Sequence, residues 1–599
     1  MSFEYVNITS DKSGNLLAYA QLVLFPIQEP YTACNVLTNN NGSSYHPNFP
    51  ATFELLNLLD LSNVCFWAKP PNIVFIVADD MGWNDVSFHG SDQVPTPNID
   101  ALAYHGVILN GHYVQPVCTP SRSAIMTGKY PVRLGMQGHV ILGDEVHALP
   151  EGKILPQYLK DLGYVTRAIG KWHLGHYSKV YTPTYRGFDS HLGYWNAGVG
   201  YYDYIFADQG AHGYDLRENL TTAWQYNGKY ATDVFTEEAE RLIRDHDTER
   251  PLFLYLAHLA CHPGDHSQLI NAPQDLINSF SYISHPDRRI LAAVMAKMDE
   301  SVGRVVTALH ERDMLNNSII VFVADNGAGS DVNWGSNFPF RGIKNSLWEG
   351  AVHGVAAVWS PLLQITSRVD HELMHISDWL PTLYAAAGGN ASDLPDDLDG
   401  VNMWPRLVSG EPSQRTEILL NYDEVAENGA VRVGDWKLVK GVQNNDYYAG
   451  ASGAEDPLFT PAYDPEEVLA SPVGQALSSV VGASPEAEDV LRLRAEATVS
   501  CPERPAHGLC NITSSSGWCV FNIRQDPCEA GDGAPADMPE GLVDTLLERL
   551  ETLSQPLMPQ PGANVTQTDL ADPKRWNNTW VPWVDCLEDE TDPMCNVIT

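Results

Sequence analysis

Short apolar runs rich in β-branched residues constrain the fold of this chain most. The first runs from Asn72 to Val77, and similar runs occupy Leu252–Ala257 and Ser318–Ala324. Such runs predict strands that are buried on both faces of a sheet. Between them, Ile154–Leu162 and Pro286–Leu315 have the apolar spacing of amphipathic helices. This alternation predicts an α/β fold in which helices flank a large, mixed and mostly parallel sheet.

The chain is too long for a single hydrophobic core, because it has 599 residues. Residues 1–70 lack clear periodicity, so we expect an N-terminal extension of unclear structure there. The α/β pattern continues to about residue 425. We therefore expect a large α/β domain over residues 71–425 and a smaller α+β subdomain over residues 426–599.

The smaller subdomain has its own pattern. Ala430–Val439 and Cys519–Ile523 are typical of antiparallel strands, which predicts a short antiparallel sheet. Met538–Leu553 has the spacing of an amphipathic helix. The segment near 444–497 is rich in Gly, Ala, Ser, Pro and acidic residues, so we expect an acidic insertion that forms a surface loop.

The charge balance excludes some partners. The chain has 75 acidic and 36 basic residues, a formal net charge of −39. Such a surface repels nucleic acid and anionic membranes, so we expect no nucleic-acid partner. No apolar stretch approaches the length of a membrane span; the best candidate, Leu16–Ile27, is too short. If the substrate is an anion, the binding site must supply its own cluster of cations.

Cysteines and glycosylation sequons favour a secretory protein. Six of the ten cysteines lie near the C-terminus and are expected to form disulfides. A zinc site is the weaker alternative, because no Cys-x-x-Cys pair occurs. Eight Asn-x-Ser/Thr sequons give mild support for a glycoprotein. Met1–Asp11 lacks the basic residues of a signal peptide, so either the signal is unusual or the natural start lies elsewhere.

Acidic and amide residues follow two of the predicted strands. Asp79 and Asp80 end the first strand, and Asp325 and Asn326 end the strand that begins near Ser318. Carboxylate and amide oxygens suit Ca²⁺, with Mg²⁺ as the second choice. One such pair alone would more often cap a helix or make a turn. Two pairs, each after a buried strand, favour a metal site.

Cys118 opens a predicted helix, because Pro120 can occupy its first turn. A helix N-terminus favours negative charge, and Arg122 lies one turn further on. This pattern is typical of a reactive thiol, although a small buried cysteine before an ordinary helix is the simpler alternative. Lys171, His173, His262 and Lys344 follow other predicted strands or turns, and only their convergence on one place would give them a role.

Two long motifs connect these residues to a known family. Residues 118–128 read Cys-Thr-Pro-Ser-Arg-Ser-Ala-Ile-Met-Thr-Gly, and residues 163–173 read Gly-Tyr-Val-Thr-Arg-Ala-Ile-Gly-Lys-Trp-His. They match both signatures of the type I sulfatases, which belong to the alkaline phosphatase superfamily. The flanking runs 170–175, 186–189 and 344–350 resemble most closely the arylsulfatase B group, the N-acetylgalactosamine-4-sulfatases. The resemblance extends from about Pro71 to the C-terminal helix.

This resemblance implies a sulfuric ester hydrolase of the arylsulfatase type that acts on aryl sulfates and on sulfated sugars such as N-acetylgalactosamine 4-sulfate. It implies that Cys118 is oxidised to formylglycine by a formylglycine-generating enzyme, and that one Ca²⁺ is bound. It also implies a lysosomal or extracellular destination. The implied metal ligands are Asp79, Asp80, Asp325 and Asn326, together with the formylglycine at position 118.

The remaining roles are also carried over from the family. Arg122 would steady the formylglycine and the metal carboxylates. Lys171 and His173 would contact the formylglycine hydroxyls, with His173 as the base for sulfate release. His262 and Lys344 would bind sulfate, with His262 as the acid for the leaving alcohol.

The motif around His262 departs from the family pattern, since Cys261-His262-Pro263-Gly264 replaces the usual His-x-Pro-Leu. This departure makes His258 and His266 rivals for its role. Gln137, His139 and Trp195 are candidates for the substrate pocket, and each is equally compatible with a structural role. Two other functions stay open: a phosphatase or phosphodiesterase of the same superfamily, and an unmodified, non-catalytic binder of sulfated glycans.

Overall fold

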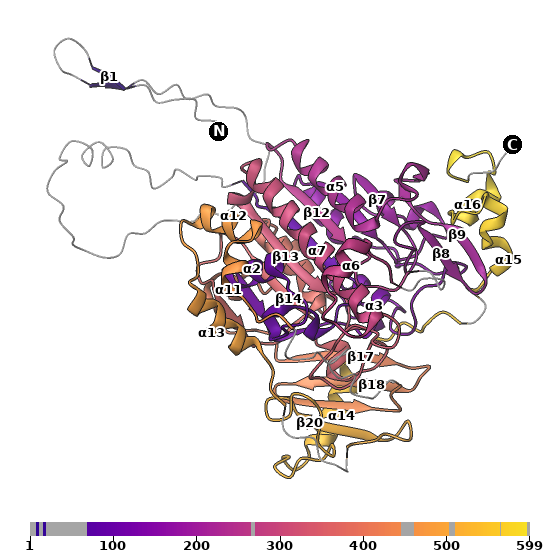
Figure 1. Ribbon diagram of the computed structural model, residues 1–599. Helices are drawn as coiled ribbons and strands as arrows, with labels where there is room; N and C mark the ends of the chain where they lie inside the picture. The colour runs from indigo at the N-terminus through magenta and orange to yellow at the C-terminus, as the bar shows by residue number, and fades with distance from the viewer. Residues whose placement is uncertain are drawn as a thin grey trace. The chain divides into compact units, whose positions relative to one another are not determined.

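The computed structural model describes residues 8–10, 16–18, 69–264, 270–444, 460–501, 509–562 and 565–595. Residues 1–68 and 69–599 form separate units. In the first unit, β1 (Ile8–Ser10) pairs antiparallel with β2 (Leu16–Ala18). The second unit contains all the other elements, which are drawn in Figure 1.

The three apolar runs form neighbouring strands at the centre of one sheet. β3 (Asn72–Ala78) lies between β12 (Leu252–Ala257) and β13 (Ser318–Ala324) and is parallel to both. All residues of these strands are buried, as the runs predict. The sheet continues beyond β12 with β6 (Val165–Lys171) and β7 (Ser190–Tyr194), which are also parallel.

The whole sheet has ten strands, in the order β11-β10-β7-β6-β12-β3-β13-β14-β4-β15. The five strands from β7 to β13 are parallel, and antiparallel pairs occur at β10–β11, β7–β10, β13–β14 and β14–β4. These results confirm the expected mixed, mostly parallel sheet. The strands on its two sides are β4 (Val107–Leu109), β10 (Arg217–Glu218), β11 (Thr221–Thr222), β14 (Ala356–Trp359) and β15 (Arg368–Asp370).

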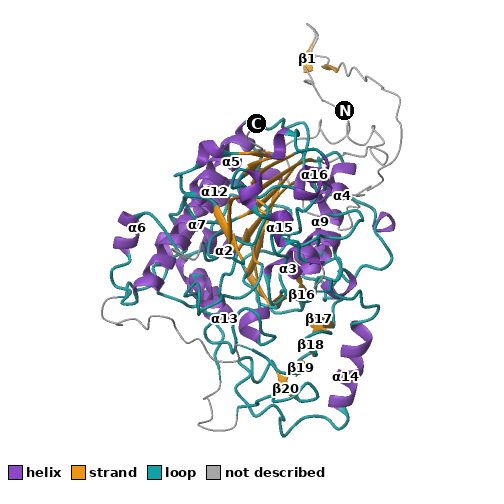
Figure 2. Ribbon diagram, turned by 90° about the vertical axis from the view of Figure 1, so that its right-hand side faces the viewer, coloured by secondary structure: helices purple, strands orange, loops and turns teal. Residues whose placement is uncertain are grey.

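Helices cover both faces of this sheet. Successive strand residues point to opposite faces, so the apolar strands expose apolar side chains on both faces that must be buried. Figure 2 shows α2, α5, α7 and α12 on one side of the strands and α3, α4 and α9 on the other. Ile73 and Phe75 belong to one apolar core, and Val74 and Ile76 belong to the other. The helices are α2 (Pro97–His105), α3 (Cys118–Thr127), α4 (Leu155–Asp161), α5 (Ala231–Arg244), α7 (Pro286–Glu311), α9 (Trp379–Ala386) and α12 (Pro472–Val481).

A second, antiparallel sheet forms from the later part of the chain, with strand order β17-β18-β19-β20. It begins with β17, before residue 426, because this strand pairs with β18. One face packs against α14 (Leu542–Leu553), which is seen beside these strands in Figure 1. The strands are β17 (Glu417–Asp423), β18 (Asn428–Val433), β19 (Trp436–Lys440) and β20 (Trp518–Asn522).

The prediction of a surface loop near 444–497 is wrong for its described part, residues 460–497. This part contains α11 (Pro465–Leu469), α12 and α13 (Ala487–Ala497). Val473 and Leu477 of α12 are buried in the same core as α2 and α7. They lie four residues apart, on one helical face, and small residues between them hid this periodicity. Residues 445–459 lie outside the described residues.

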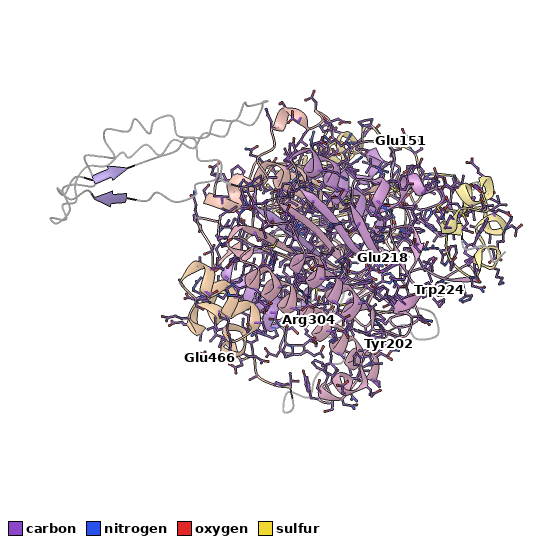
Figure 3. All side chains as sticks on the ribbon, turned by 90° about the horizontal axis from the view of Figure 1, so that it is seen from above. Glu151, Tyr202, Glu218, Trp224, Arg304 and Glu466 are labelled. Carbon is purple, nitrogen blue, oxygen red and sulfur yellow. A yellow bond between two sulfur atoms is a disulfide. The ribbon has the colours of Figure 1, made fainter. Side chains whose placement is uncertain are left out.

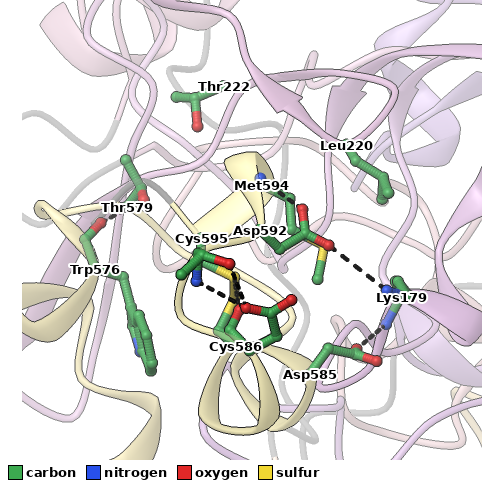
Figure 4. The surroundings of a disulfide bond; sticks show 12 residues. Lys179, Leu220, Thr222, Trp576, Thr579, Asp585, Cys586, Asp592, Met594 and Cys595 are labelled. Carbon is green, nitrogen blue, oxygen red and sulfur yellow. Dashed lines mark hydrogen bonds and ion pairs between the residues drawn. A yellow bond between two sulfur atoms is a disulfide. The ribbon is translucent and has the colours of Figure 1, made fainter. Parts of the chain in front are cut away.

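The six C-terminal cysteines form disulfides, as expected: Cys501–Cys528, Cys510–Cys519 and Cys586–Cys595. Figure 4 shows the last of these beside Lys179, whose backbone N–H donates to Asp585 Oδ2 at 2.6 Å. The disulfide-closed C-terminal segment is therefore tied to the large sheet domain. Among the described residues, Cys118 and Cys261 are the free cysteines, and both are buried.

Acidic side chains are spread over the surface. Exposed Glu151, Glu218 and Glu466, labelled in Figure 3, come from distant parts of the chain. Within the described ranges, no helix is both long and apolar enough to cross a membrane.

Candidate active site

The pairs Asp79–Asp80 and Asp325–Asn326 meet at the carboxyl ends of β3 and β13. These strands are neighbours, with Ala78 opposite Ala324, so the residues that follow them lie side by side. The backbone N–H of Asp80 donates to Asp325 Oδ1 at 3.2 Å, and Asn326 Nδ2 donates to Asp80 Oδ1 at 2.7 Å. Asp79 is also fully buried there. The structure thus brings together the four oxygen-bearing side chains that the sequence singled out.

Cys118 is the first residue of α3, as predicted, and it faces the acidic group. Its Sγ atom lies 3.6 Å from Asp79 Oδ1 and 3.8 Å from Asp80 Oδ1. Lys344 Nζ lies 3.2 Å from the same sulfur. The side chain at position 118 therefore sits between the carboxylates and a cation.

Three cations neutralise the three carboxylates. Arg122 Nη2 lies 2.9 Å from Asp325 Oδ2 and 3.4 Å from Asp79 Oδ1. Lys171 Nζ lies 2.6 Å from Asp79 Oδ2. The third pair joins Lys344 Nζ to Asp80, at 2.5 Å from Oδ1 and 2.7 Å from Oδ2. This is the local cluster of cations that the negative surface demands of an anion-binding site.

The pKa values of the carboxyl groups diverge according to their surroundings. Burial raises the pKa of Asp80, but attraction to Lys344, His262 and Lys171 outweighs it and holds this pKa below its ordinary value. Burial and the nearby Asp79 charge raise the pKa of Asp325 to about 6, although Arg122 opposes the shift. Asp80 is therefore firmly ionised, whereas Asp325 gains a proton more readily than Asp80 does.

The surroundings of Cys118 disfavour the thiolate form of its side chain. Burial raises its pKa to about 12, and the neighbouring Lys171 and Lys344 offset only part of this effect. A protonated thiol is a weak nucleophile. The interpretation of Cys118 as a reactive thiol is therefore not supported for the residue as encoded.

Two histidines lie at the site. His262 Nε2 is 3.8 Å from Asp80 Oδ2, and its Nδ1 lies 2.6 Å from the Pro263 carbonyl oxygen. His173 is buried, with Nε2 3.1 Å from the Ile141 carbonyl oxygen. Burial and the charge of Lys171 hold the pKa of both rings well below the ordinary value, so both are neutral at pH 7.

The rivals of His262 are placed elsewhere or are not described. His258 Nε2 lies 3.1 Å from the Ser301 hydroxyl, which belongs to α7. Its ring therefore points into the helical face of the domain. His266 lies outside the described residues. Of the two described candidates, His258 and His262, it is His262 that lies next to the carboxylates.

The donor set fits a hard cation such as Ca²⁺. Asp79, Asp80, Cys118 and His262 can place one ligand atom each within 4.8 Å of one another. Asn326 Oδ1 is buried and has no hydrogen-bond partner among the described residues, while its Nδ2 faces Asp80. Turning this amide would direct its oxygen toward the carboxylates, where a bound cation would give it a partner. Three carboxylates and an amide oxygen are the ligand type that Ca²⁺ prefers.

Comparison with known proteins agrees with this geometry. The family model described as "Sulfatase" matches residues 71–389, which is more than half of the chain and contains every residue of the site. The chain belongs to the sulfatase family. This assignment confirms the resemblance to the type I sulfatases and supports a sulfuric ester hydrolase.

Several curated proteins and solved structures resemble this sulfatase. Mouse arylsulfatase J is 41% identical over 62% of this chain and 64% of its own length, so the match covers just under two thirds of that relative. Human N-acetylgalactosamine-6-sulfatase is 29% identical over 77% of this chain and 91% of its own length. The crystal structure of Ps i-CgsB in complex with k-i-k-neocarrahexaose shares the fold, with a TM-score of 0.61 and 23% identity; the match covers 88% of this chain and 100% of that one. These relatives do not single out the arylsulfatase B group, which stays a prediction.

The three residues predicted to line the substrate pocket, Gln137, His139 and Trp195, each contact another side chain of the protein. Gln137 Nε2 donates to Glu424 Oε2 at 2.8 Å, and His139 Nε2 lies 2.7 Å from Glu145 Oε1. Trp195 is buried, with the guanidinium of Arg217 4.9 Å from its ring centroid.

Sequence reasoning missed two residues, one next to His173 and one next to His262. The Thr119 hydroxyl lies 3.2 Å from the His173 carbonyl oxygen. Gly198 lies so close to His262 that a Cβ atom there would be 2.6 Å from the ring Nδ1. Thr119 occupies a variable position of the first motif, and Gly198 belongs to no motif.

Proposed function

We propose that this sulfatase hydrolyses sulfate esters through a formylglycine made from Cys118. The observation that carries the proposal is the place of Cys118. This side chain opens a helix, lies within 4 Å of Asp79, Asp80 and Lys344, and is buried. A nucleophile at this point would meet cations that can balance the negative charge of a sulfate group.

The neutral state of the Cys118 thiol makes it a poor nucleophile, which supports the conversion of this residue to formylglycine. With a pKa raised to about 12 by burial, Cys118 would hold little thiolate at neutral pH. Formylglycine, as its aldehyde hydrate, supplies a hydroxyl nucleophile and a second hydroxyl that can release sulfate.

One Ca²⁺ would be held by Asp79, Asp80, Asp325 and Asn326, together with the modified residue 118. When bound, such an ion polarises sulfate oxygens and favours the ionised form of a hydroxyl group. Arg122 is fully buried and bonds Asp325, so it holds this ligand in place rather than meeting substrate.

The exposure of the remaining residues separates their roles. The side chains of Lys344 and His262 are 13% and 14% exposed, whereas that of Lys171 is fully buried. Lys344 and His262 therefore face the direction from which a substrate enters. We assign sulfate binding to both. We also assign proton donation to the leaving alcohol to His262, which must first gain a proton because its ring is neutral in the free protein.

Lys171 and His173 are both buried, and we assign them roles at residue 118. Lys171 Nζ lies 2.6 Å from Asp79 Oδ2, and its positive charge favours negative charge on the nucleophile. We also assign Lys171 a contact with the bound sulfate. His173 accepts the proton that leaves residue 118 as sulfate is released. Its neutral ring, whose pKa is lowered by burial, is in the correct state to accept a proton.

The proposed substrate is a sulfated sugar, with N-acetylgalactosamine 4-sulfate as the first choice and aryl sulfates as surrogate substrates. The names of two relatives, an arylsulfatase and an N-acetylgalactosamine-6-sulfatase, support this class and make the 6-sulfate the closest alternative. The net charge of −39 makes the buried cations essential for binding an anion.

We further propose maturation in the secretory pathway, followed by a lysosomal or extracellular destination. The three disulfides support an oxidising compartment. The sequon residues Asn219, Asn316, Asn390 and Asn511 are exposed and so accessible to glycosylation. A formylglycine-generating enzyme is the partner that this route requires.

The test combines mass spectrometry with assays. The protein is co-expressed with a formylglycine-generating enzyme, and the Cys118 peptide is examined for conversion. Sulfate release is then measured from an aryl sulfate and from the 4- and 6-sulfates of N-acetylgalactosamine. Faster hydrolysis of the matched phosphate esters would support the phosphatase alternative. An unmodified thiol in protein from its native host, with glycan binding but no turnover, would support the non-catalytic binder.

A further inference from the structure

The Thr119 hydroxyl joins two segments that surround His173. Thr119 follows Cys118 in α3 and is fully buried. Its Oγ1 donates to the His173 carbonyl oxygen at 3.2 Å and accepts from the Ile141 backbone N–H at 3.2 Å. The Ile141 carbonyl oxygen lies 3.1 Å from His173 Nε2. These three contacts close a ring that contains the nucleophile helix, the histidine and the loop around Ile141.

The ring of contacts determines which nitrogen of His173 can take a proton. A carbonyl oxygen only accepts hydrogen bonds, so the hydrogen of the neutral imidazole is on Nε2. Nδ1 then carries the lone pair. It is buried and has no hydrogen-bond partner among the described residues. When Nδ1 gains a proton, the Ile141 carbonyl still stabilises the charged ring through Nε2–H.

The backbone of His173 needs such support. Its φ angle is 56°, in the left-handed region that residues other than glycine seldom adopt. The N–H group donates to the Trp195 carbonyl oxygen at 3.0 Å. The Thr119 hydroxyl holds the carbonyl group on the other side of the residue, so both peptide groups are fixed.

The loop around Ile141 is anchored at its outer end as well. Leu142 N–H donates to Glu145 Oε2 at 3.1 Å, and Val146 N–H donates to the Val565 carbonyl oxygen at 2.8 Å. The C-terminal segment therefore holds the far side of the loop. Thr119 is the contact that ties the near side, Ile141 itself, to the nucleophile helix.

We propose that Thr119 is a positioning residue for His173, acting through Ile141 to fix the ring with Nδ1 as its proton acceptor. The proposal rests on the proposed function, in which His173 accepts the proton that leaves residue 118. Thr119 does not touch substrate in this role. Its hydroxyl sets the orientation of a second residue, as partners of catalytic histidines do elsewhere.

The kinetic test uses two variants. Thr119→Val keeps the shape and removes the hydroxyl, whereas Thr119→Ser keeps the hydroxyl. Because Thr119 is adjacent to Cys118, the residue that must be converted, kcat is divided by the formylglycine content of each variant. We expect kcat per converted site to fall about 10- to 100-fold in Thr119→Val with little change in KM, and to recover largely in Thr119→Ser. A normal kcat in Thr119→Val would overturn the proposal.

A matched control separates this effect from general loss of a buried hydroxyl. Thr236 is also buried, and its hydroxyl donates to the Thr232 carbonyl oxygen at 2.6 Å within α5, away from the site. Thr236→Val should keep the normal kcat per converted site. An equal loss of kcat in this variant would assign the Thr119→Val result to the fold and would count against the proposal.

A structural readout is independent of activity. Crystal structures of both variants with unmodified Cys118 would show the contact between His173 Nε2 and Ile141 O. It should persist in Thr119→Ser and break in Thr119→Val; an intact contact in both would overturn the proposal. If the wild-type protein hydrolyses no sulfate ester, the proposed function fails, while these structures still decide whether Thr119 positions the ring.

Discussion

Lys344 Nζ lies 3.2 Å from Cys118 Sγ while it also pairs with both oxygens of Asp80. Lys344 comes from the segment after β13, far along the chain from the nucleophile helix. Its side chain is partly open to solvent, unlike that of Lys171. This relationship makes Lys344 the cation best placed to meet both residue 118 and an entering sulfate group.

Replacing Lys344 should therefore weaken substrate capture. Loss of a charge-assisted hydrogen bond costs about 1.5–3 kcal/mol, so we expect Lys344→Ala to lower kcat/KM about 10- to 100-fold. Steady-state kinetics with an aryl sulfate measure the change. As a control, Lys129→Ala removes a lysine that pairs with Asp397 at the surface and should leave kcat/KM unchanged. Equal values for the wild type and Lys344→Ala would contradict the role.

The two free cysteines offer a matched pair. Cys118→Ala should abolish turnover and leave the melting temperature nearly unchanged, because it removes one small side chain. Cys261→Ala removes a second buried thiol but should keep activity per folded protein. Assays at equal folded concentration, judged by circular dichroism, make the comparison. If Cys118→Ala were as active as the wild type, residue 118 could not be the nucleophile.

Calcium should stabilise the folded protein. A ligand at 100 times its Kd adds about 2.7 kcal/mol to the free energy of unfolding, which a rise in melting temperature would report. Asp325→Asn should remove most of this rise, because it deletes a negative ligand. Asp299→Asn, which alters a buried carboxyl group away from the site, should retain it. A calcium-dependent rise that is equal in Asp325→Asn and the wild type would place the ion elsewhere.

Gly198 should be intolerant of even a methyl group. A Cβ atom there would lie 2.6 Å from His262 Nδ1 and 3.1 Å from the Pro263 carbonyl oxygen, so the imidazole or its loop must move. We expect Gly198→Ala to lower kcat about tenfold or more, because an ångström of displacement is costly in catalysis. Gly562→Ala is the control, since its Cβ would meet no atom within 4 Å. Normal kinetics in Gly198→Ala would show that His262 tolerates displacement.

Asp299 should make stability fall as the pH rises toward neutrality. Burial raises the pKa of this carboxyl group to about 7 from its ordinary value of 3.8, although hydrogen bonds from Ile99 and Asn98 oppose the shift and Asp100 adds to it. The folded state therefore holds a proton that the unfolded state has lost. The resulting stability is complete below about pH 4 and is lost as the pH rises through about 7.

Urea unfolding at pH 5 and pH 7.5 measures this effect. The free energy of unfolding of the wild type should decrease between these values by more than that of Asp299→Asn, which cannot ionise at this position. The difference between the two proteins isolates Asp299 from other groups, including Asp100, whose pKa burial raises to about 6. Parallel pH dependences would show that Asp299 does not titrate in this range.

The sequence by itself determined the strands, the helix that begins at Cys118, and the convergence of the acidic pairs. Strand burial and helical spacing are local patterns, and parallel neighbouring strands bring their carboxyl ends to one edge. The motifs also identified the family, because their residues serve one chemistry. The helices within residues 460–497 escaped detection, since their apolar residues are few and become meaningful only against α2 and α7.

Tertiary structure alone decided the finer features of the site. In the folded chain His258 contacts α7, whereas His262 lies next to Asp80. Ile141 contacts both Thr119 and His173. Tertiary structure also raised the pKa of Cys118, because burial of the thiol outweighs the nearby lysines. Hydrogen bonds and burial depend on atoms that come from distant segments of the chain. No local pattern around a single residue carries that information.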